Sequence, residues 1–212
     1  MGPPPRPAAP AARKMKVWPI VLAVLGLMCL SGAGLVGTVV ALGKAGKNQP
    51  VTAEDRTLLV TTDDLAARVA DFEVQSGVEQ LKKTKGLDGS VVLEYEYKPT
   101  GGALFLNTTV TTERSASTAT TNYASLRVGH GLGFSMSADK QTKMEDRNDL
   151  FSWGDESHHA LITHSGKPVG NLFAARKGRH IYSVMVVGVY FDSTETIGDL
   201  LLPKLEQLAK QP

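Results

Sequence analysis

The chain has 212 residues, of which 42% are hydrophobic, 21% charged and 6% aromatic, and its formal net charge is +2. This composition excludes a collagen, a coiled coil, a wholly disordered chain and a membrane protein with many spans. Of the 23 basic residues, six lie within residues 1–50, where there is no acidic residue. Residues 51–212 therefore contain 17 basic and 21 acidic residues. The basic character therefore belongs to a short N-terminal region.

An uncharged apolar segment, residues 17–43, follows the first basic residues and runs for 27 positions. A helix rises about 1.5 Å per residue, so this segment is long enough to cross a hydrocarbon core of about 30 Å. Four basic residues precede it, and only Lys44 and Lys47 follow closely. Because positive charge is retained in the cytoplasm, the bias predicts a single-pass protein of the cell inner membrane with a cytoplasmic N-terminus and a periplasmic or extracellular domain.

Two other interpretations of the apolar segment remain open. A basic region before an apolar run is also typical of a cleaved signal peptide, with Ala41-Leu42-Gly43 as a weak cleavage site, and Cys29 could carry a lipid. Signal peptides have apolar regions of about 7–15 residues, so the length favours an uncleaved signal-anchor. Cys29 is the only cysteine, so the outer domain has no disulfide.

The chain divides by composition into four parts. Residues 1–16 contain five prolines and predict a disordered cytoplasmic tail. Residues 17–43 predict the transmembrane helix, the polar residues 44–56 a tether, and residues 57–212 an extracytoplasmic domain.

The first half of this domain predicts a helix and three antiparallel strands. A short helix begins near Thr62, with Leu65, Val69 and Phe72 on one face. Residues 78–85 and 91–98 then predict a hairpin that turns at Asp88-Gly89, because apolar and polar residues alternate in the second strand. Residues 103–110 predict the third strand.

The middle of the domain predicts a second helix and a loop. Ser115 is suited to cap the helix, and Gly129 to end it. The glycine-rich stretch 129–133 lacks the spacing of a phosphate-binding loop and is interpreted as the helix exit. Residues 137–149 carry seven charges without an apolar period, which predicts an exposed loop.

The C-terminal third predicts a three-stranded meander and a final helix. The strands cover residues 158–164, 169–176 and 179–191, and the last is apolar on both faces, so both faces should be covered. Asp192 and Glu195 resemble a capping box, and Pro203 should kink or split the helix. The fold class is α+β, an antiparallel sheet of about six strands covered by helices and preceded by one transmembrane helix.

This order of elements resembles the PsbP-like fold, an antiparallel sheet between helices that occurs in envelope proteins. The likeness covers roughly residues 55–210 and rests on the hairpin at Asp88-Gly89, the middle helix, the meander, the long apolar strand and the capped final helix. The resemblance implies a non-enzymatic adaptor or ligand-binding role. It includes no diagnostic motif, so it assigns no functional residue.

The densest group of candidate catalytic or metal-binding side chains lies between Asp155 and His164. On a strand, His158 and His164 share a face about 20 Å apart, too far to bind one ion, and His159 points to the other face. These residues are therefore interpreted as polar groups on a half-exposed edge strand. A triad of Ser157, His159 and Asp155 is not favoured, because no Gly-x-Ser-x-Gly motif is present.

Three other features favour structural roles. The basic cluster Lys82, Lys83 and Lys85 lacks interleaved aromatic residues, so no nucleic-acid partner is expected. Asn107-Thr108-Thr109 matches a glycosylation acceptor but falls within a predicted strand. The strand tyrosines are interpreted as core residues: Tyr95, Tyr97, Tyr182 and Tyr190.

The sequence therefore predicts a membrane-anchored extracytoplasmic binding or adaptor module, not an enzyme, whose partner is an envelope protein or an apolar ligand. No catalytic, cofactor-binding or metal-binding residue is assigned, and no cofactor is expected. The alternative is an envelope hydrolase or metal-dependent enzyme that uses the Asp155–His164 segment. A third hypothesis is a scaffold that makes contacts through the charged loop Asp139–Asp149.

Overall fold

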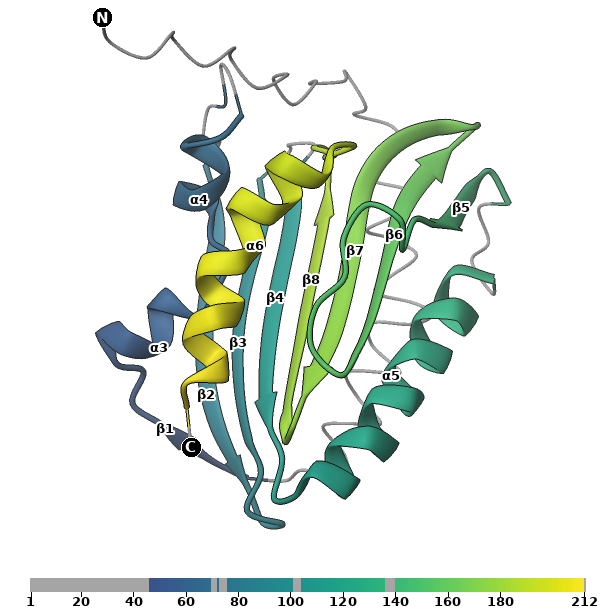
Figure 1. Cartoon of the computed structure of the whole chain (residues 1–212). Helices are drawn as coiled ribbons and strands as arrows, with labels where there is room; N and C mark the ends of the chain where they lie inside the picture. Colours follow the sequence, from purple (N-terminus) through teal and green to yellow (C-terminus); the bar gives the residue numbers. More distant parts are fainter. Residues whose placement is uncertain (1–45, 70–71, 73–75, 101–103, 136–139, 212) are drawn as a thin grey trace, which may run out of the picture.

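A computed structural model describes residues 46–69, 72, 76–100, 104–135 and 140–211. The predicted tail (1–16) and transmembrane helix (17–43) lie outside these residues. Within the described part of the chain, none of the helices combines the length and apolar character needed to cross a bilayer. The described residues form a mixed α+β architecture around one antiparallel sheet, which Figure 1 shows face on.

The sheet has eight strands. They are β1 (Gly46–Gln49), β2 (Gly77–Gly86), β3 (Val91–Pro99), β4 (Phe105–Thr112), β5 (Thr142–Asp146), β6 (Glu156–His164), β7 (Lys167–Lys177) and β8 (His180–Val187). Their order across the sheet is β1-β2-β3-β4-β8-β7-β6-β5. The six predicted strands are all present, and the predicted hairpin and meander are confirmed by the pairing of β2 with β3 and of β6, β7 and β8 in sequence.

The two additional strands, β1 and β5, form the edges of the sheet. β1 and a short helix, α3 (Ala53–Thr57), lie in the segment expected to be a tether, and β5 lies in the segment expected to be an exposed loop. Both expectations of irregular structure were wrong at these positions. Both strands are short and polar, and each pairs with one neighbour only. Their sequences lack the alternation of apolar and polar residues that predicts a strand.

The remaining helices are α4 (Thr62–Ala66), α5 (Ala116–Ser135) and α6 (Thr194–Ala209). α4 begins near the predicted position, after a capping box formed by Thr61 and Asp64. The predicted cap of α6 was wrong by one residue, because the Ser193 hydroxyl accepts the hydrogen bond from the Thr196 backbone N–H.

α5 is longer than the sequence indicates. The Ser115 hydroxyl accepts a hydrogen bond from the Thr118 N–H and so caps the helix as predicted. The helix then continues through Gly129, Gly131 and Gly133 to Ser135, so the interpretation of residues 129–133 as a helix exit was wrong. Packing of the helix against the sheet outweighs the low helix propensity of three glycines.

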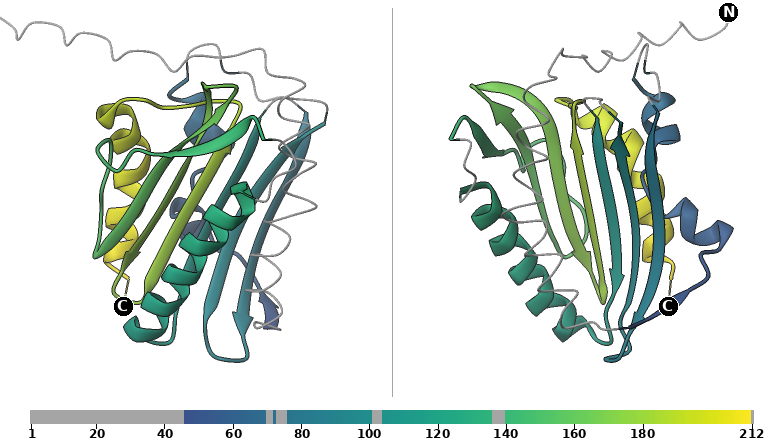
Figure 2. Two further views of the ribbon diagram at one scale, coloured as in Figure 1. Left: turned by 90° about the vertical axis from the view of Figure 1, so that its right-hand side faces the viewer. Right: turned by 180° about the vertical axis from the view of Figure 1, so that it is seen from behind.

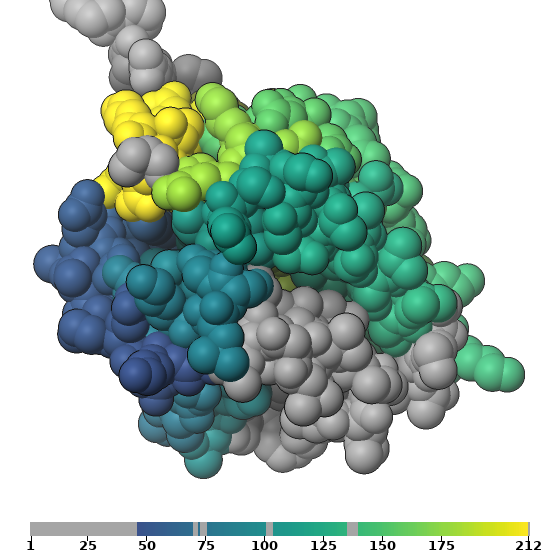
Figure 3. All heavy atoms as spheres, turned by 90° about the horizontal axis from the view of Figure 1, so that it is seen from below, coloured from purple at the N-terminus to yellow at the C-terminus, as the bar shows by residue number. Residues whose placement is uncertain are grey.

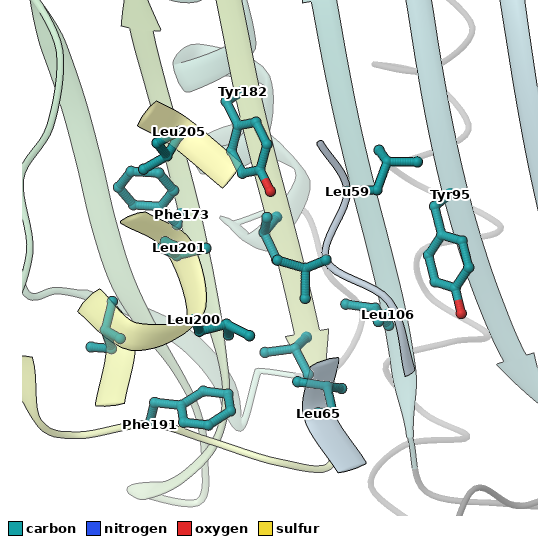
Figure 4. Close-up of a cluster of buried hydrophobic side chains, with 14 of the residues drawn as sticks. Leu59, Leu65, Tyr95, Leu106, Phe173, Tyr182, Phe191, Leu200, Leu201 and Leu205 are labelled. Carbon is teal, nitrogen blue, oxygen red and sulfur yellow. The ribbon is translucent and has the colours of Figure 1, made fainter. Parts of the chain in front are cut away.

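The larger core lies between the sheet and α6, and α4 contributes to it (Figure 4). Its side chains come from β3, β4, β7 and β8, from the segment Leu58–Val60, and from α6, whose predicted stripe of Ile197, Leu201, Leu205 and Leu208 is buried. Tyr95, Tyr97 and Tyr182 are also buried, as predicted, whereas Tyr190 is only partly buried.

Part of the second face of the sheet, formed by β5, β7 and β8, is covered by α5 (Figure 2). Two smaller apolar clusters form this layer, one around Leu172 and Met185 and one around Tyr123 and Ala174. All eight residues of β8 are buried, so the prediction that this strand is covered on both faces is confirmed.

Candidate functional site

The candidate residues between Asp155 and His164 lie mostly on β6, and this strand is not an edge. It pairs with β5 on one side and β7 on the other. His158 and His159 are 4% and 1% exposed, so the interpretation of a half-exposed edge strand was wrong. The difference arises from β5, a strand that the sequence did not predict. It pairs with β6 on the side that was expected to be an exposed edge.

His158 lies on the sheet face beneath α5 and pairs with an acidic residue of β5. Its Nε2 is 2.8 Å from Oδ1 of Asp146, whose side chain is largely exposed. Burial, with a smaller contribution from nearby His158, lowers the pKa of His130 on α5 to about 4. Within the described residues, Nδ1 of His158 and Nδ1 of His130 are buried without a hydrogen-bond partner. The group combines residues of α5, β5 and β6, and neither His130 nor Asp146 was among the candidate residues that the sequence indicated.

His159 points to the opposite face, as strand alternation predicts. Its Nδ1 donates to the Arg147 carbonyl at 3.0 Å, and its Nε2 is 3.2 Å from the amide nitrogen of Asn171. The Asn171 side chain also bonds the backbone N–H and carbonyl of Phe191. An amide N–H can donate only to a neutral imidazole nitrogen, and burial lowers the pKa of His159, so both observations indicate a neutral ring.

The first residues of the segment form ion pairs instead of a catalytic triad. Asp155 and Glu156 both accept hydrogen bonds from the Arg176 guanidinium at 2.9 Å, and Asp155 also accepts one from the Gly178 N–H. The Ser157 hydroxyl accepts a bond from the Trp153 N–H. Ser157, His159 and Asp155 therefore bond to different partners and do not form a relay.

His164 ends the strand beside β5, where its Nδ1 is 2.9 Å from the Thr142 hydroxyl. The three histidines of β6 thus occupy three separate environments. In the part of the chain that the structure describes, no group of three or more histidine, cysteine, aspartate or glutamate side chains is placed to hold a metal ion. The geometry of these residues gives the hydrolase or metal-enzyme alternative no support.

An open depression between α4 and α6 is a second candidate site. Its volume is about 490 Å³, and the side chains that line it include the partly exposed Leu202 and one cation, Arg68. The full lining is Ala67, Arg68, Gly198, Asp199, Leu202 and Pro203. It therefore places an apolar side chain beside the carboxylate of Asp199 and beside Arg68, which also pairs with Asp64 at 3.9 Å.

Arg68 also explains why α6 continues as one helix across Pro203. Proline has no N–H, so the carbonyl of Asp199, four residues earlier, loses its helical partner. The Arg68 guanidinium donates to this carbonyl at 2.9 Å and to the Asp64 carbonyl at 3.0 Å. Of the predicted kink or split at Pro203, the split does not occur, because a side chain from the α4 segment supplies the missing donor.

A small internal cavity lies under α6, between His159, Asn171 and mostly apolar side chains of the sheet and helix. Its volume is about 20 Å³. A single water molecule needs roughly 10–15 Å³ by this measure, so the cavity is too small for an apolar ligand. Of the two cavities described, only the open depression can hold part of another molecule.

The remaining sequence features make local contacts. Lys83 of the basic cluster forms an ion pair with Asp55 at 2.8 Å. Asn107 lies on β4, where its amide donates to Glu94.

No family model matches the chain, and neither a curated protein nor a solved structure is similar to it at a significant level. The resemblance to the PsbP-like fold therefore stays a prediction, and function must be argued from the chain itself.

Proposed function

We propose that the protein is a single-pass membrane protein whose α+β domain lies outside the cytoplasm and acts as a binding or adaptor module. One observation carries the proposal. The uncharged segment ends at Gly43, and β1 begins at Gly46, already paired with β2. The domain thus follows the apolar segment almost without a linker, and the basic residues before that segment favour a cytoplasmic N-terminus.

The depression between α4 and α6 supports binding of another protein over binding of an enclosed apolar ligand. Leu202 is 38% exposed on its wall, and Arg68 is fixed there by hydrogen bonds to two backbone carbonyls. A guanidinium and a carboxylate held beside an apolar side chain fit an extended segment that carries an apolar side chain and charged side chains of both signs. The partner proposed is an envelope protein.

Membrane topology is tested by labelling single cysteines in intact cells. In a Cys29→Ser background, Val128→Cys places a thiol at a side chain that is 62% exposed on α5, and Ala8→Cys places one in the N-terminal tail. A membrane-impermeant maleimide should label position 128 in intact cells and position 8 only after lysis. The reverse pattern, or release of the protein by alkaline carbonate, would contradict the proposal.

The binding surface is tested by crosslinking in intact membranes. A photoreactive residue at position 202 should give an adduct with a defined envelope protein, and the same residue at position 128 is the matched control. Arg68→Leu should reduce the adduct from position 202. Equal adducts from both positions, or none from position 202, would exclude the depression as the binding surface.

A further inference from the structure

One end of the sheet is strongly basic, and the register of the strands places its residues in one row. Lys47 of β1 lies opposite Lys85 of β2, Lys85 opposite Val91, and Val91 opposite Thr112 of β4. The row continues through His180 of β8 to Lys177 of β7. We call this end the basic end; its exposed cations are Lys47, Lys85, Arg114, Lys177, Arg179 and Lys210.

Figure 3 views the molecule from the basic end. The start of β1, the β2–β3 turn, the β4–α5 junction, the β7–β8 turn and the C-terminal end of α6 all meet here, as Figure 1 also shows. The contact of His180 with the backbone of Gln211 holds the C-terminal end at this position.

The exposed cations of the basic end outnumber the carboxylates beside them. Lys47 and Lys85 are direct cross-strand neighbours, and like charges in such pairs are destabilising. Among the nearby carboxylates, Asp155 pairs with Arg176. Glu113, which is buried and bonds Asn122, and Asp88, which accepts two hydrogen bonds from Ser90, keep their negative charges but are fewer than the cations. An external anionic surface would compensate the excess of positive charge.

An apolar side chain projects from the same end. Leu87, in the β2–β3 turn, is 84% exposed, more than any other large hydrophobic side chain in the described residues. It follows Lys85 and Gly86, and Gly86 is the direct partner of Gly46, the first described residue. The side chain therefore lies beside the point where the chain enters the domain.

The position of the apolar segment identifies what faces this end. Only three residue steps separate Gly43 from Gly46, and an extended chain covers at most about 3.6 Å per residue, so the entry point lies within about 11 Å of the segment's end. That distance is close to the Debye length of about 8–10 Å, over which charges at a lipid surface act. If the segment is anchored as proposed above, the basic end is held at the lipid headgroups.

We propose that the basic end docks on anionic lipid headgroups, with Leu87 inserted at the membrane interface, so that the sheet stands with this end on the bilayer. The inference rests on the proposed membrane anchor. The opposite end of the sheet, which includes Val78 and the β6–β7 turn, then points away from the membrane.

The test uses the full chain in nanodiscs of phosphatidylcholine, with and without phosphatidylglycerol. In a Cys29→Ser background, Leu87→Cys carries an environment-sensitive fluorophore, and Val78→Cys at the other end of β2 is the matched control, because Val78 is also exposed, at 55%. The label at 87 should shift to the blue and lose quenching by iodide several-fold in phosphatidylglycerol discs. The label at 78 should not change.

Charge variants separate lipid binding from general contact. Lys47→Gln with Lys85→Gln should abolish the lipid-dependent shift at position 87, as should high salt. Lys143→Gln with Lys167→Gln removes two exposed lysines from the opposite end and should leave the shift intact. A shift that survives the first pair, or one that is equal in phosphatidylcholine alone, would overturn the inference.

Two further outcomes distinguish the inference from the proposed function. A chain that does not incorporate into nanodiscs contradicts the membrane anchor itself. A chain that incorporates but shows no difference between positions 87 and 78 contradicts only the docking of the basic end. A shift seen in native membranes but not in nanodiscs would mean that the partner of this end is a protein, which also overturns the inference.

Discussion

Asn171 joins segments that lie far apart in the sequence. Its amide contacts His159 on β6 and both backbone groups of Phe191, which leads from β8 into α6. His159 in turn holds the carbonyl of Arg147 in the connection after β5. This buried chain of bonds requires a neutral His159, so protonation would break the bond between Asn171 and the ring.

We predict that acid destabilises the domain through its buried histidines. Burial lowers the folded-state pKa values of His130 and His159, so their contribution is fully present above about pH 6.5 and is lost as the pH falls. For His130 the loss is complete only below its pKa of about 4. His130→Leu should reduce the loss of stability between pH 7.5 and pH 5 by about 1–2 kcal/mol.

Denaturant unfolding of the full chain in detergent micelles at the two pH values measures this effect. His164→Gln is the control, because His164 is only partly buried and sits at the end of β6. An acid loss that is the same in His130→Leu and the parent would contradict the prediction.

At this scale the sequence indicated the direction of each side chain but not its partners. Alternation along the strand correctly separated His158 from His159. The partners Asp146, His130 and Asn171 depend on a short polar edge strand and on a helix that runs beyond its expected end, and neither carries an apolar period. The hydrogen-bond partners and burial of the candidate residues therefore could not be predicted from the apolar periodicity of the sequence.

At the scale of elements, α6 depends on α4 for its continuity. The carbonyl freed by Pro203 is bonded by Arg68, and Asp64 of α4 also pairs with Lys204 at 3.0 Å. The proline thus creates an acceptor that ties two helices together, whereas an alanine at this position would bond its own helix.

We predict that Arg68 and Pro203 are energetically coupled. Arg68→Leu should cost about 1–3 kcal/mol in the parent, because it leaves a carbonyl without its charged donor. In a Pro203→Ala background the same change should cost about 1 kcal/mol less, because the alanine N–H satisfies Asp199. A double-mutant cycle from chemical denaturation measures the coupling, and strictly additive effects would refute it.

The glycines of α5 allow a further prediction at this scale. A Cβ added at Gly131 meets no atom within 4 Å, so Gly131→Ala should stabilise the protein by about 0.5–1 kcal/mol through helix propensity. Gly170→Ala on β7 is the matched opposite, because its Cβ would collide with the Val186 carbonyl, and we expect clear destabilisation. Thermal unfolding of both variants checks the pair, and a destabilised Gly131→Ala would contradict the assignment of α5.

At the scale of the whole molecule, β8 is the most protected element. It is bonded to β4 and β7 on its two sides and is buried on both faces. We predict that its amides exchange most slowly with solvent and that those of β1 and β5 exchange fastest, because each edge strand has only one neighbour. Hydrogen exchange of the full chain measures this order, and fast exchange in β8 would contradict the topology.

The overall class and the central six strands could be predicted because each carries an apolar face or an apolar run. The hairpin turn at Asp88-Gly89, where Gly89 has a φ of +85°, was also readable, since few residues other than glycine adopt that conformation. The strand order could not be read, because it depends on where α5 carries the chain after β4. That crossing places β5 at the far edge and brings β8 beside β4.

The two edges of the sheet have a consequence for behaviour at high concentration. β1 has four residues and β5 has five, and each carries a lysine in its short exposed run. Edge strands this brief and this charged offer little backbone to an incoming strand of another molecule. The domain is therefore protected against fibril growth by strand addition, even when many copies crowd together on a surface.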